Sequence, residues 1–231
     1  MKRVGVHGAG FMPITQMVPC PAGAVAADWW DPDNEGLCIW AAYQPKGAAD
    51  LAASYVDLSG NGNNAGVGVA PTWDAVNGWK FNGTTQYLTT TFVPQTDQSQ
   101  SFLIQFTNLV GFDGWIIGAR GGIVSRIAGI QPNYNVMPQV RYWNGNGVSV
   151  APPLLAGHLA VAGDTGYRNG VSEGAPIPTY TGAAIQMWIG ARNNLWVAEL
   201  FCQVYVQAMA FYDCTLTAPQ VAAVAAAMAA L

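Results

Sequence analysis

The chain has 231 residues, enough for one domain with a sizeable core, and its nine Lys and Arg against thirteen Asp and Glu give a net charge of −4. The basic residues do not cluster: Lys2 with Arg3 is the densest pair, and a surface that tracks nucleic-acid phosphates needs a basic patch. No apolar run approaches the roughly 20 residues that a membrane-spanning helix needs. We therefore expect neither nucleic acid nor a membrane as a partner.

The low content of charged residues is the most unusual feature of the composition. Charged residues make up 10% of the chain, whereas roughly 25% is typical of soluble domains. Hydrophobic residues reach 51%, and nine of them are Trp. Either the surface is covered by neutral polar side chains, or much of it lies against neighbouring subunits, because obligate interfaces are poor in Lys and Glu. We favour the second explanation and expect a homo-oligomer or a subunit of a larger assembly.

Residues 1–36 are rich in Gly, Pro and Ala and show no sustained hydrophobic period, so we predict an extended N-terminal arm. A terminal segment is usually ordered only when contacts tie it down, and we expect this arm to gain such contacts by docking on neighbouring subunits. The side chains predicted to make these contacts are Phe11, Met12, Trp29 and Trp30.

The first residues match a secretory signal only in part. A basic start leads into weakly apolar sequence, but the apolar centre is interrupted by His7, Pro13, Gln16 and Pro19. A signal core tolerates such residues badly. We therefore expect that the chain is not exported by that route.

An acidic segment closes the predicted arm. In Asp31-Pro32-Asp33-Asn34-Glu35-Gly36, side-chain oxygens at positions 1, 3 and 5 and the glycine at position 6 match the first half of a calcium-binding loop. Position 12, which should supply a bidentate carboxylate, is Ala42. Two interpretations stay open, a Ca²⁺ site formed by Asp31, Asp33 and Glu35 or a plain acidic turn, and we expect no other cofactor.

From Leu37 onward the pattern is that of a β domain. Short apolar or alternating segments are separated by turns rich in Gly, Asn and Pro, which is typical of a β-sandwich or jelly roll. The turn at Asp57–Asn64 is best explained by Asx side chains that cap their own loop. The predicted strands lie at 37–43, 78–81, 86–92, 101–107, 114–119, 123–130, 136–143, 158–162, 184–189 and 200–212, with a hairpin turn at Asn169-Gly170.

The tail changes to a helical period. Thr217 is a predicted N-cap, Pro219 lies in the first turn, and Gln220 stands three residues after the cap. These signals predict a short Ala-rich helix over 218–230. Because such a helix is marginal alone, we expect its apolar side chains to pack on the sandwich or on a partner.

Several of these segments, taken in order, resemble a known fold. The turn and hairpin over 57–91, the hairpin at Tyr167–Gly170, the strand at Ile189–Ala191 and the closing segment Phe211–Thr217 with its helix are similar to the laminin-G-like group of concanavalin A-like lectin and glucanase jelly rolls. The resemblance covers about residues 37–231 and implies an all-β jelly-roll sandwich. The segment Ala41–Gly47 is similar to a segment of uncharacterised proteins of tailed bacteriophages that carry such a domain.

The four cysteines, Cys20, Cys38, Cys202 and Cys214, form no C-x-x-C pair and are too few for a disulfide scaffold in a chain of this length. Buried free thiols are the simplest interpretation. The resemblance implies that the strands of Cys38 and Cys202 lie close together, so a bridge between these two is the alternative.

Catalysis is not favoured by the sequence. Glucanases of the resembling group place paired carboxylates close together on one strand, and retaining hydrolysis needs two carboxyl groups about 5–5.5 Å apart. The three glutamates, Glu35, Glu173 and Glu199, have no such partner in a predicted strand. A Gly-x-Ser-x-Gly nucleophile elbow is also missing. We therefore expect a protein that is not an enzyme.

Two segments have the composition of a sugar site, in which exposed aromatic faces are ringed by amides. Both are predicted to be loops, and Trp73 and Trp115 would add aromatic surface. The competing interpretation, which we favour, is that these aromatic residues fill the core or an interface. The candidate sugar-binding residues are Tyr142, Trp143, Asn144 and Asn146 in the first segment and Arg192, Asn193, Asn194 and Trp196 in the second.

Together these features predict a non-enzymatic structural or adhesion subunit of a bacteriophage virion. It would be displayed on the capsid or tail, assemble in the host cytoplasm and contact other virion proteins. The alternative is a carbohydrate-binding module, secreted or at a cell surface, that recognises cell-surface or environmental glycans.

Overall fold

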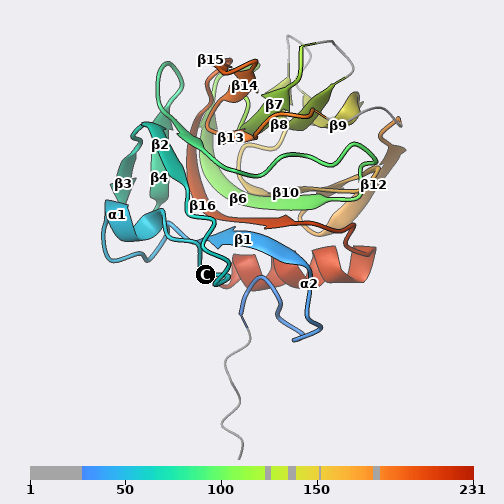
Figure 1. Cartoon of the computed structure of the whole chain (residues 1–231), viewed down its shortest axis with the longest axis horizontal. Coiled ribbons are helices and arrows are strands. Elements are labelled where there is room, and N and C mark those ends of the chain that lie inside the picture. The colour runs from blue at the N-terminus through green and yellow to red at the C-terminus, as the bar shows by residue number, and fades with distance from the viewer. Residues whose placement is uncertain (1–27, 123–125, 135–138, 151, 179–182) are drawn as a thin grey trace, which may run out of the picture.

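The computed structural model describes residues 28–122, 126–134, 139–150, 152–178 and 183–231. The strands form two sheets that pack face to face as a β-sandwich, as predicted (Figure 1). Pairing is antiparallel apart from β7 with β14 and one isolated bridge. None of the helices in the described part of the chain is long and apolar enough to cross a membrane.

The first sheet, called sheet A, has the strand order β12-β11-β10-β6-β16-β4-β3, and β1 also pairs with β16. Its strands are β1 (Ile39–Tyr43), β3 (Thr72–Asp74), β4 (Gly78–Asn82), β6 (Ser101–Val110), β10 (Gly157–Ala162), β11 (Thr165–Arg168), β12 (Val171–Pro176) and β16 (Gln203–Tyr212).

The second sheet, called sheet B, has the order β15-β14-β7-β13-β5-β2, and β8 pairs with both β7 and β9. Its strands are β2 (Gly66–Val69), β5 (Tyr87–Thr89), β7 (Ile117–Arg120), β8 (Ile127–Tyr134), β9 (Gln139–Val150), β13 (Trp188–Ile189), β14 (Arg192–Asn194) and β15 (Val197–Glu199). The two helices are α1 (Leu51–Ser54) and α2 (Ala218–Ala229).

The main core lies between the two sheets. Strand residues alternate between the faces of a sheet, so one set of side chains from each strand points inward. On β16 the inward set includes Met209 and Phe211, and Phe211 lies opposite Phe102 of β6. The large side chains of this core are Tyr43, Trp79, Phe81, Phe92, Phe102, Phe106, Tyr142 and Phe211.

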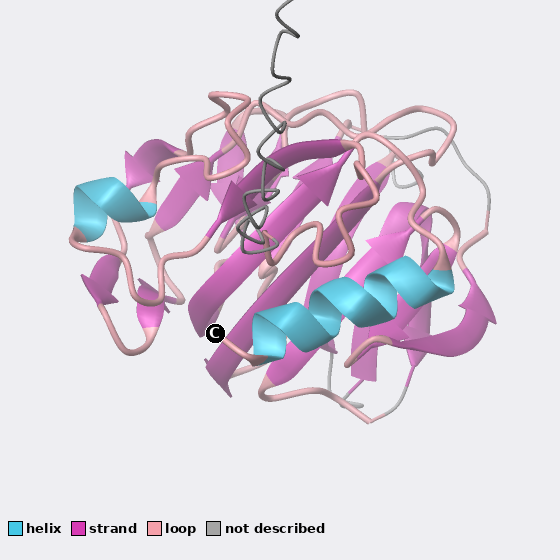
Figure 2. Ribbon diagram, turned by 90° about the horizontal axis from the view of Figure 1, so that it is seen from below, coloured by secondary structure: helices cyan, strands magenta, loops and turns pink. Residues whose placement is uncertain are grey.

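Helix α2 covers the outer face of sheet A (Figure 2). It begins as predicted after Thr217, whose backbone N–H donates to the Gln220 side chain at 2.8 Å. The buried residues Val221, Val224 and Met228 face the outward set of β16, which includes Tyr212. Because both faces of β16 are therefore covered, its sequence is almost continuously apolar.

Trp29 and Trp30 belong to this second cluster, which corrects their prediction as free docking side chains. Both are buried among residues of this chain, and the Tyr212 hydroxyl donates to the Trp30 carbonyl at 2.8 Å. They extend the domain's own packing because β16 and α2 offer an apolar surface to the segment that precedes β1. Phe11 and Met12 lie outside the described residues.

The turn after α1 is held by one buried carboxylate, as the Asx interpretation predicted. Asp57 accepts hydrogen bonds from the backbone N–H groups of Ala42 (2.9 Å), Ser59 (3.0 Å) and Asn63 (3.0 Å). The Asn63 amide then donates to the Trp40 carbonyl at 2.7 Å. One acidic side chain thus fixes the turn and attaches it to β1.

A disulfide joins Cys38 to Cys214, with Cα atoms 6.0 Å apart and a sequence separation of 176 positions. The interpretation as buried free thiols is therefore wrong for Cys38 and Cys214 and right for Cys202, which is buried and free. The alternative bridge between Cys38 and Cys202 is wrong as well. The reason is the register of β1 on β16, in which Ile39 lies opposite Tyr212 and brings the residues just outside both strands together. Cys20 lies outside the described residues.

We predict that Asp57→Ala lowers the free energy of unfolding by roughly 3 kcal/mol, because several donors that meet a charged acceptor lose it at once. Urea denaturation would measure the change. Asp33→Ala removes an exposed carboxylate instead and should stay within roughly 0.5 kcal/mol of the parent protein. Equal effects of the two substitutions would contradict the assigned role of Asp57.

We also predict that the double variant Cys38→Ser, Cys214→Ser loses roughly 2–5 kcal/mol of stability, because the cross-link restricts the unfolded chain. Reductant should lower the stability of the parent protein to that of the variant and leave the variant unchanged. Peptide mapping without reductant should recover the two cysteines in one cross-linked species. A parent protein that does not respond to reductant would argue against the bridge.

Candidate functional site

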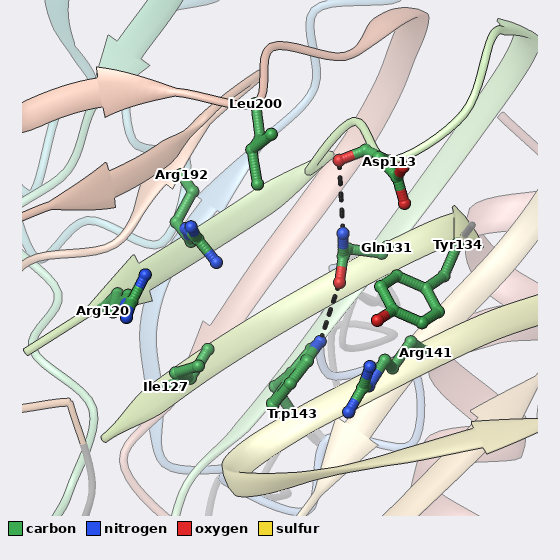
Figure 3. A pocket seen from close by; sticks show the side chains of 9 residues that line it. All are labelled: Asp113, Arg120, Ile127, Gln131, Tyr134, Arg141, Trp143, Arg192 and Leu200. Atoms are coloured by element: carbon green, nitrogen blue, oxygen red, sulfur yellow. Dashed lines mark hydrogen bonds between the residues drawn. The ribbon is translucent and has the colours of Figure 1, made fainter. Parts of the chain in front are cut away.

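A pocket of about 410 Å³ opens on the face of sheet B that is turned away from sheet A. Strand alternation decides which side chains reach it. On β9, Val140 and Tyr142 belong to the core between the sheets, whereas Arg141 and Trp143 line the pocket. The full lining is Asp113, Arg120, Ile127, Gln131, Tyr134, Arg141, Trp143, Arg192 and Leu200 (Figure 3).

Two tryptophans form a layer beneath the pocket. Trp115 and Trp143 stack with ring centroids 5.7 Å apart, and Ile127 packs with them. Gly118 of β7 lies opposite Gly129 of β8, and a Cβ atom at either position would collide with the Trp115 ring. These two glycines therefore make room for an indole that lies against the sheet.

Guanidinium groups cover these indoles. The Arg141 guanidinium lies 4.0 Å from the Trp143 ring centroid and 4.4 Å from that of Tyr134. The Arg192 guanidinium lies 5.1 Å from the ring centroid of Trp115. A cation placed above an aromatic ring is attracted to the face of that ring, and the stacking fixes the plane of each guanidinium group.

Gln131 stands in the middle of the pocket and connects its parts (Figure 3). Its Oε1 accepts from the Trp143 indole N–H at 3.0 Å, and its amide donates to the Asp113 backbone carbonyl at 3.2 Å. Arg120 and Arg192 lie on one side of it, and Arg141 with Tyr134 lies on the other. The hydrogen bonds hold the pocket centre in one conformation.

The three arginines differ in the hydrogen-bond partners of their guanidinium groups. Arg192 forms an ion pair with Glu199, through both Nε (2.8 Å) and Nη2. The buried Nε atoms of Arg120 and Arg141 have no hydrogen-bond partner among the described residues. Buried polar atoms are usually paired, so these two groups have donor capacity to offer a ligand.

The first predicted sugar-binding segment is part of β9 and not a loop. Tyr142 and Asn144 are buried, and the Tyr142 hydroxyl donates to the Tyr167 carbonyl at 3.0 Å. The Asn144 amide donates to the Gly163 carbonyl at 2.7 Å. Both residues therefore hold the two sheets together, and only Trp143 reaches the pocket. The side chain of Asn146 lies outside the description.

The second predicted segment is a hairpin of β14 and β15, again not a loop. Arg192 lines the pocket, whereas Asn193 is buried and its amide donates to the Gln186 carbonyl at 2.8 Å. Asn194 lies opposite Arg120 of β7. Trp196 is at the turn with 64% of its surface exposed, so it is the one predicted aromatic residue that presents its ring to solvent. Trp73 is partly buried against the core, and Trp115 is fully buried.

The acidic segment before β1 is arranged as a turn. The Asp31 carboxylate accepts from the backbone N–H groups of Glu35 at 3.0 Å and Gly36 at 2.9 Å, and Glu35 accepts from the Gln220 amide at 2.7 Å. No group of three or more His, Cys, Asp or Glu side chains in the described ranges is placed to hold a metal ion. The geometry thus accounts for Asp31 and Glu35 without calcium and leaves Asp33 exposed.

Sequence reasoning missed Arg120, Gln131, Tyr134 and Arg141. The available signal was weak: Arg120 and Arg141 are each the single charged residue of their strand, and charged residues are seldom found in a buried sheet without a partner. Their convergence with Arg192 depends on β7 pairing with both β8 and β14, which no local pattern predicts.

Comparisons with known proteins give a likeness of fold alone. No protein-family model and no curated protein sequence matches the chain. Domain 4 of AbnA, a GH43 extracellular arabinanase from Geobacillus stearothermophilus solved with arabinotriose, is similar over 82% of this chain and 98% of that one, with a TM-score of 0.55 and 15% identity.

Two further structures are similar over 80% of this chain. A Trypanosoma rangeli sialidase has a TM-score of 0.56 and 15% identity, and the chain spans 32% of its length. The binding domain of botulinum neurotoxin serotype G has a TM-score of 0.50 and 12% identity, with 50% of its length spanned. The chain therefore has a β-sandwich fold, similar to a domain of an arabinanase and to parts of a sialidase and of a toxin binding domain.

Proposed function

We propose that this protein is a carbohydrate-binding domain whose site is the pocket on sheet B together with the tip of the β14–β15 hairpin. The observation that carries the proposal is an open pocket in which Arg, Gln and aromatic side chains converge on the outer face of sheet B. The arabinanase domain with the same fold was solved with a bound trisaccharide, which supports the proposal.

The size and lining of the pocket suit a sugar. About 410 Å³ is within the range of small-molecule sites, which combine apolar walls with a few polar groups that fix orientation. Sugar hydroxyl groups can accept from the guanidinium groups of Arg120 and Arg141. The exposed Trp196 ring offers a flat apolar face to a second sugar unit of the same chain.

We further propose that binding occurs without turnover. Glycoside hydrolysis uses two carboxyl groups that flank the scissile bond, one of them an acid. Asp113 lines the pocket, and the second nearby carboxylate, Glu199, is held in its ion pair with Arg192, so the pair of carboxyl groups that hydrolysis uses is not offered to a glycosidic bond.

A virion role, as capsid decoration or tail-associated protein, is a second and compatible proposal. It is supported by the 10% content of charged residues and by exposed apolar side chains such as Phe112 and Val171. The disulfide favours a protein that ends up in an oxidising environment, on a particle outside the cell or secreted. Light scattering of the full chain and of a variant without residues 1–27 tests the assembly role, since loss of oligomers on truncation supports it and a monomer in both forms contradicts it.

We predict that Trp196→Ala weakens glycan binding about tenfold, equivalent to about 1.4 kcal/mol, because it removes the exposed stacking face. Thermal stability should not change, since the side chain is largely in solvent. A glycan array would identify the ligand, and titration calorimetry would measure both variants.

The matched control is Val76→Ala, which removes an apolar side chain that is 71% exposed in the turn between β3 and β4 of sheet A. This variant should bind like the parent protein. An array without signal above background for any glycan would contradict the proposed function itself.

A further inference from the structure

The pocket concentrates positive charge in a chain that has very little of it. The whole sequence contains nine Lys and Arg, and three of them, Arg120, Arg141 and Arg192, are among the nine residues that line this one pocket. They come from three separate strands, β7, β9 and β14, so they are brought together by the fold and not by adjacency in sequence.

From this concentration we infer that the site binds an acidic glycan, one whose sugar units carry a carboxylate that the arginines of the pocket receive. The inference rests on the proposed carbohydrate-binding function and specifies its ligand class. A guanidinium group presents a planar fork of donors that matches the two oxygens of a carboxylate.

The charge balance around the pocket supports one bound carboxylate. Glu199 is paired with Arg192, and Asp113 also lines the pocket. Counted against these two carboxylates, the three guanidinium groups leave one positive charge. An anionic group on the ligand would neutralise it, and the field at the pocket would attract such a ligand.

The orientation of the arginines points to the same ligand. Stacking on Trp143 and Tyr134 fixes the plane of the Arg141 guanidinium but satisfies none of its N–H donors. The buried Nε atoms of Arg120 and Arg141 have no hydrogen-bond partner in the part of the chain that the structure describes. Burying part of a cationic group without a partner is costly, and a carboxylate bound at these two guanidinium groups reduces this cost.

A neutral sugar stacked on the pocket floor fits less well. Trp115 is fully buried and Trp143 is nearly so, because guanidinium groups lie over both rings. A ligand that enters the pocket therefore meets the arginines and not the indole faces. Trp196, at the hairpin tip, is 64% exposed and offers an open ring to an apolar sugar face.

The test is an array of matched glycan pairs. Oligosaccharides of galacturonate, glucuronate, mannuronate and sialic acid would be printed beside the same compounds after reduction of their carboxyl groups, with a sulfated series alongside. We expect binding of at least one carboxylated member at least ten times tighter than that of its reduced partner. That binding should weaken as salt is raised, because the interaction is between charges.

Substitutions then locate the site. Arg120→Gln and Arg141→Gln should each weaken binding of the carboxylated glycan at least tenfold and reduce the difference between the matched pair. Arg141→Lys keeps the charge and most of the stem, so it preserves the fold more safely while removing the planar fork, and it should give an intermediate loss. The control is Arg126→Gln, which removes the same charge from an exposed residue beside β8 that does not line the pocket.

The outcomes separate this inference from the proposed function. Equal binding of carboxylated and reduced partners would overturn the acidic-glycan assignment and leave a carbohydrate-binding domain in place. A preference for the sulfated series over the carboxylated one would overturn the carboxylate assignment. If Arg120→Gln and Arg141→Gln both bind the glycan like the parent protein, the assignment of the binding site to this pocket would be overturned. Failure to bind any member of the array would contradict the proposed function as well.

Discussion

The structure depends first on the burial of strand β16 on both of its faces. This strand pairs with β6 along one edge and with β1 and β4 along the other, so it joins segments from both ends of the chain. Its inward side chains pack against sheet B, and its outward side chains receive helix α2 and the two tryptophans that precede β1. The disulfide and the Asp57 turn then fasten β1, the neighbour of β16, in its register.

The same arrangement decides where a ligand can bind. Helix α2 covers the outer face of sheet A, whereas the outer face of sheet B carries the pocket. The outward positions of β7, β8 and β9 therefore hold arginine, glutamine and tryptophan in place of a purely apolar set. Glycines at 118 and 129 let an indole lie against the sheet, and that indole and its neighbour support the guanidinium groups above them.

Much of the architecture was predictable because it depends on local periods. Alternation of apolar residues located most of the longer strands. Thr217, Pro219 and Gln220 predicted a helix that begins at residue 218, as observed for α2, and the predicted end differs from the observed one by one residue. The predictions were wrong for side chains whose environment is set by contacts with segments far away in the sequence. Trp29 and Trp30 looked available to partners because nothing near them in sequence explains their burial, and Tyr142 and Asn144 looked like loop residues because Asn and Gly are common in turns.

The sequence by itself determined the all-β class, the terminal helix and the Asx-capped turn, since each follows from contacts within a few residues. It also determined that charge is scarce, which gives the three arginines their significance. Only the tertiary structure decided that Cys38 meets Cys214 and that Arg120, Arg141 and Arg192 share one pocket. These meetings follow from which strands pair and in which register, and strand pairing is selected by the packing of the whole core rather than by any local pattern.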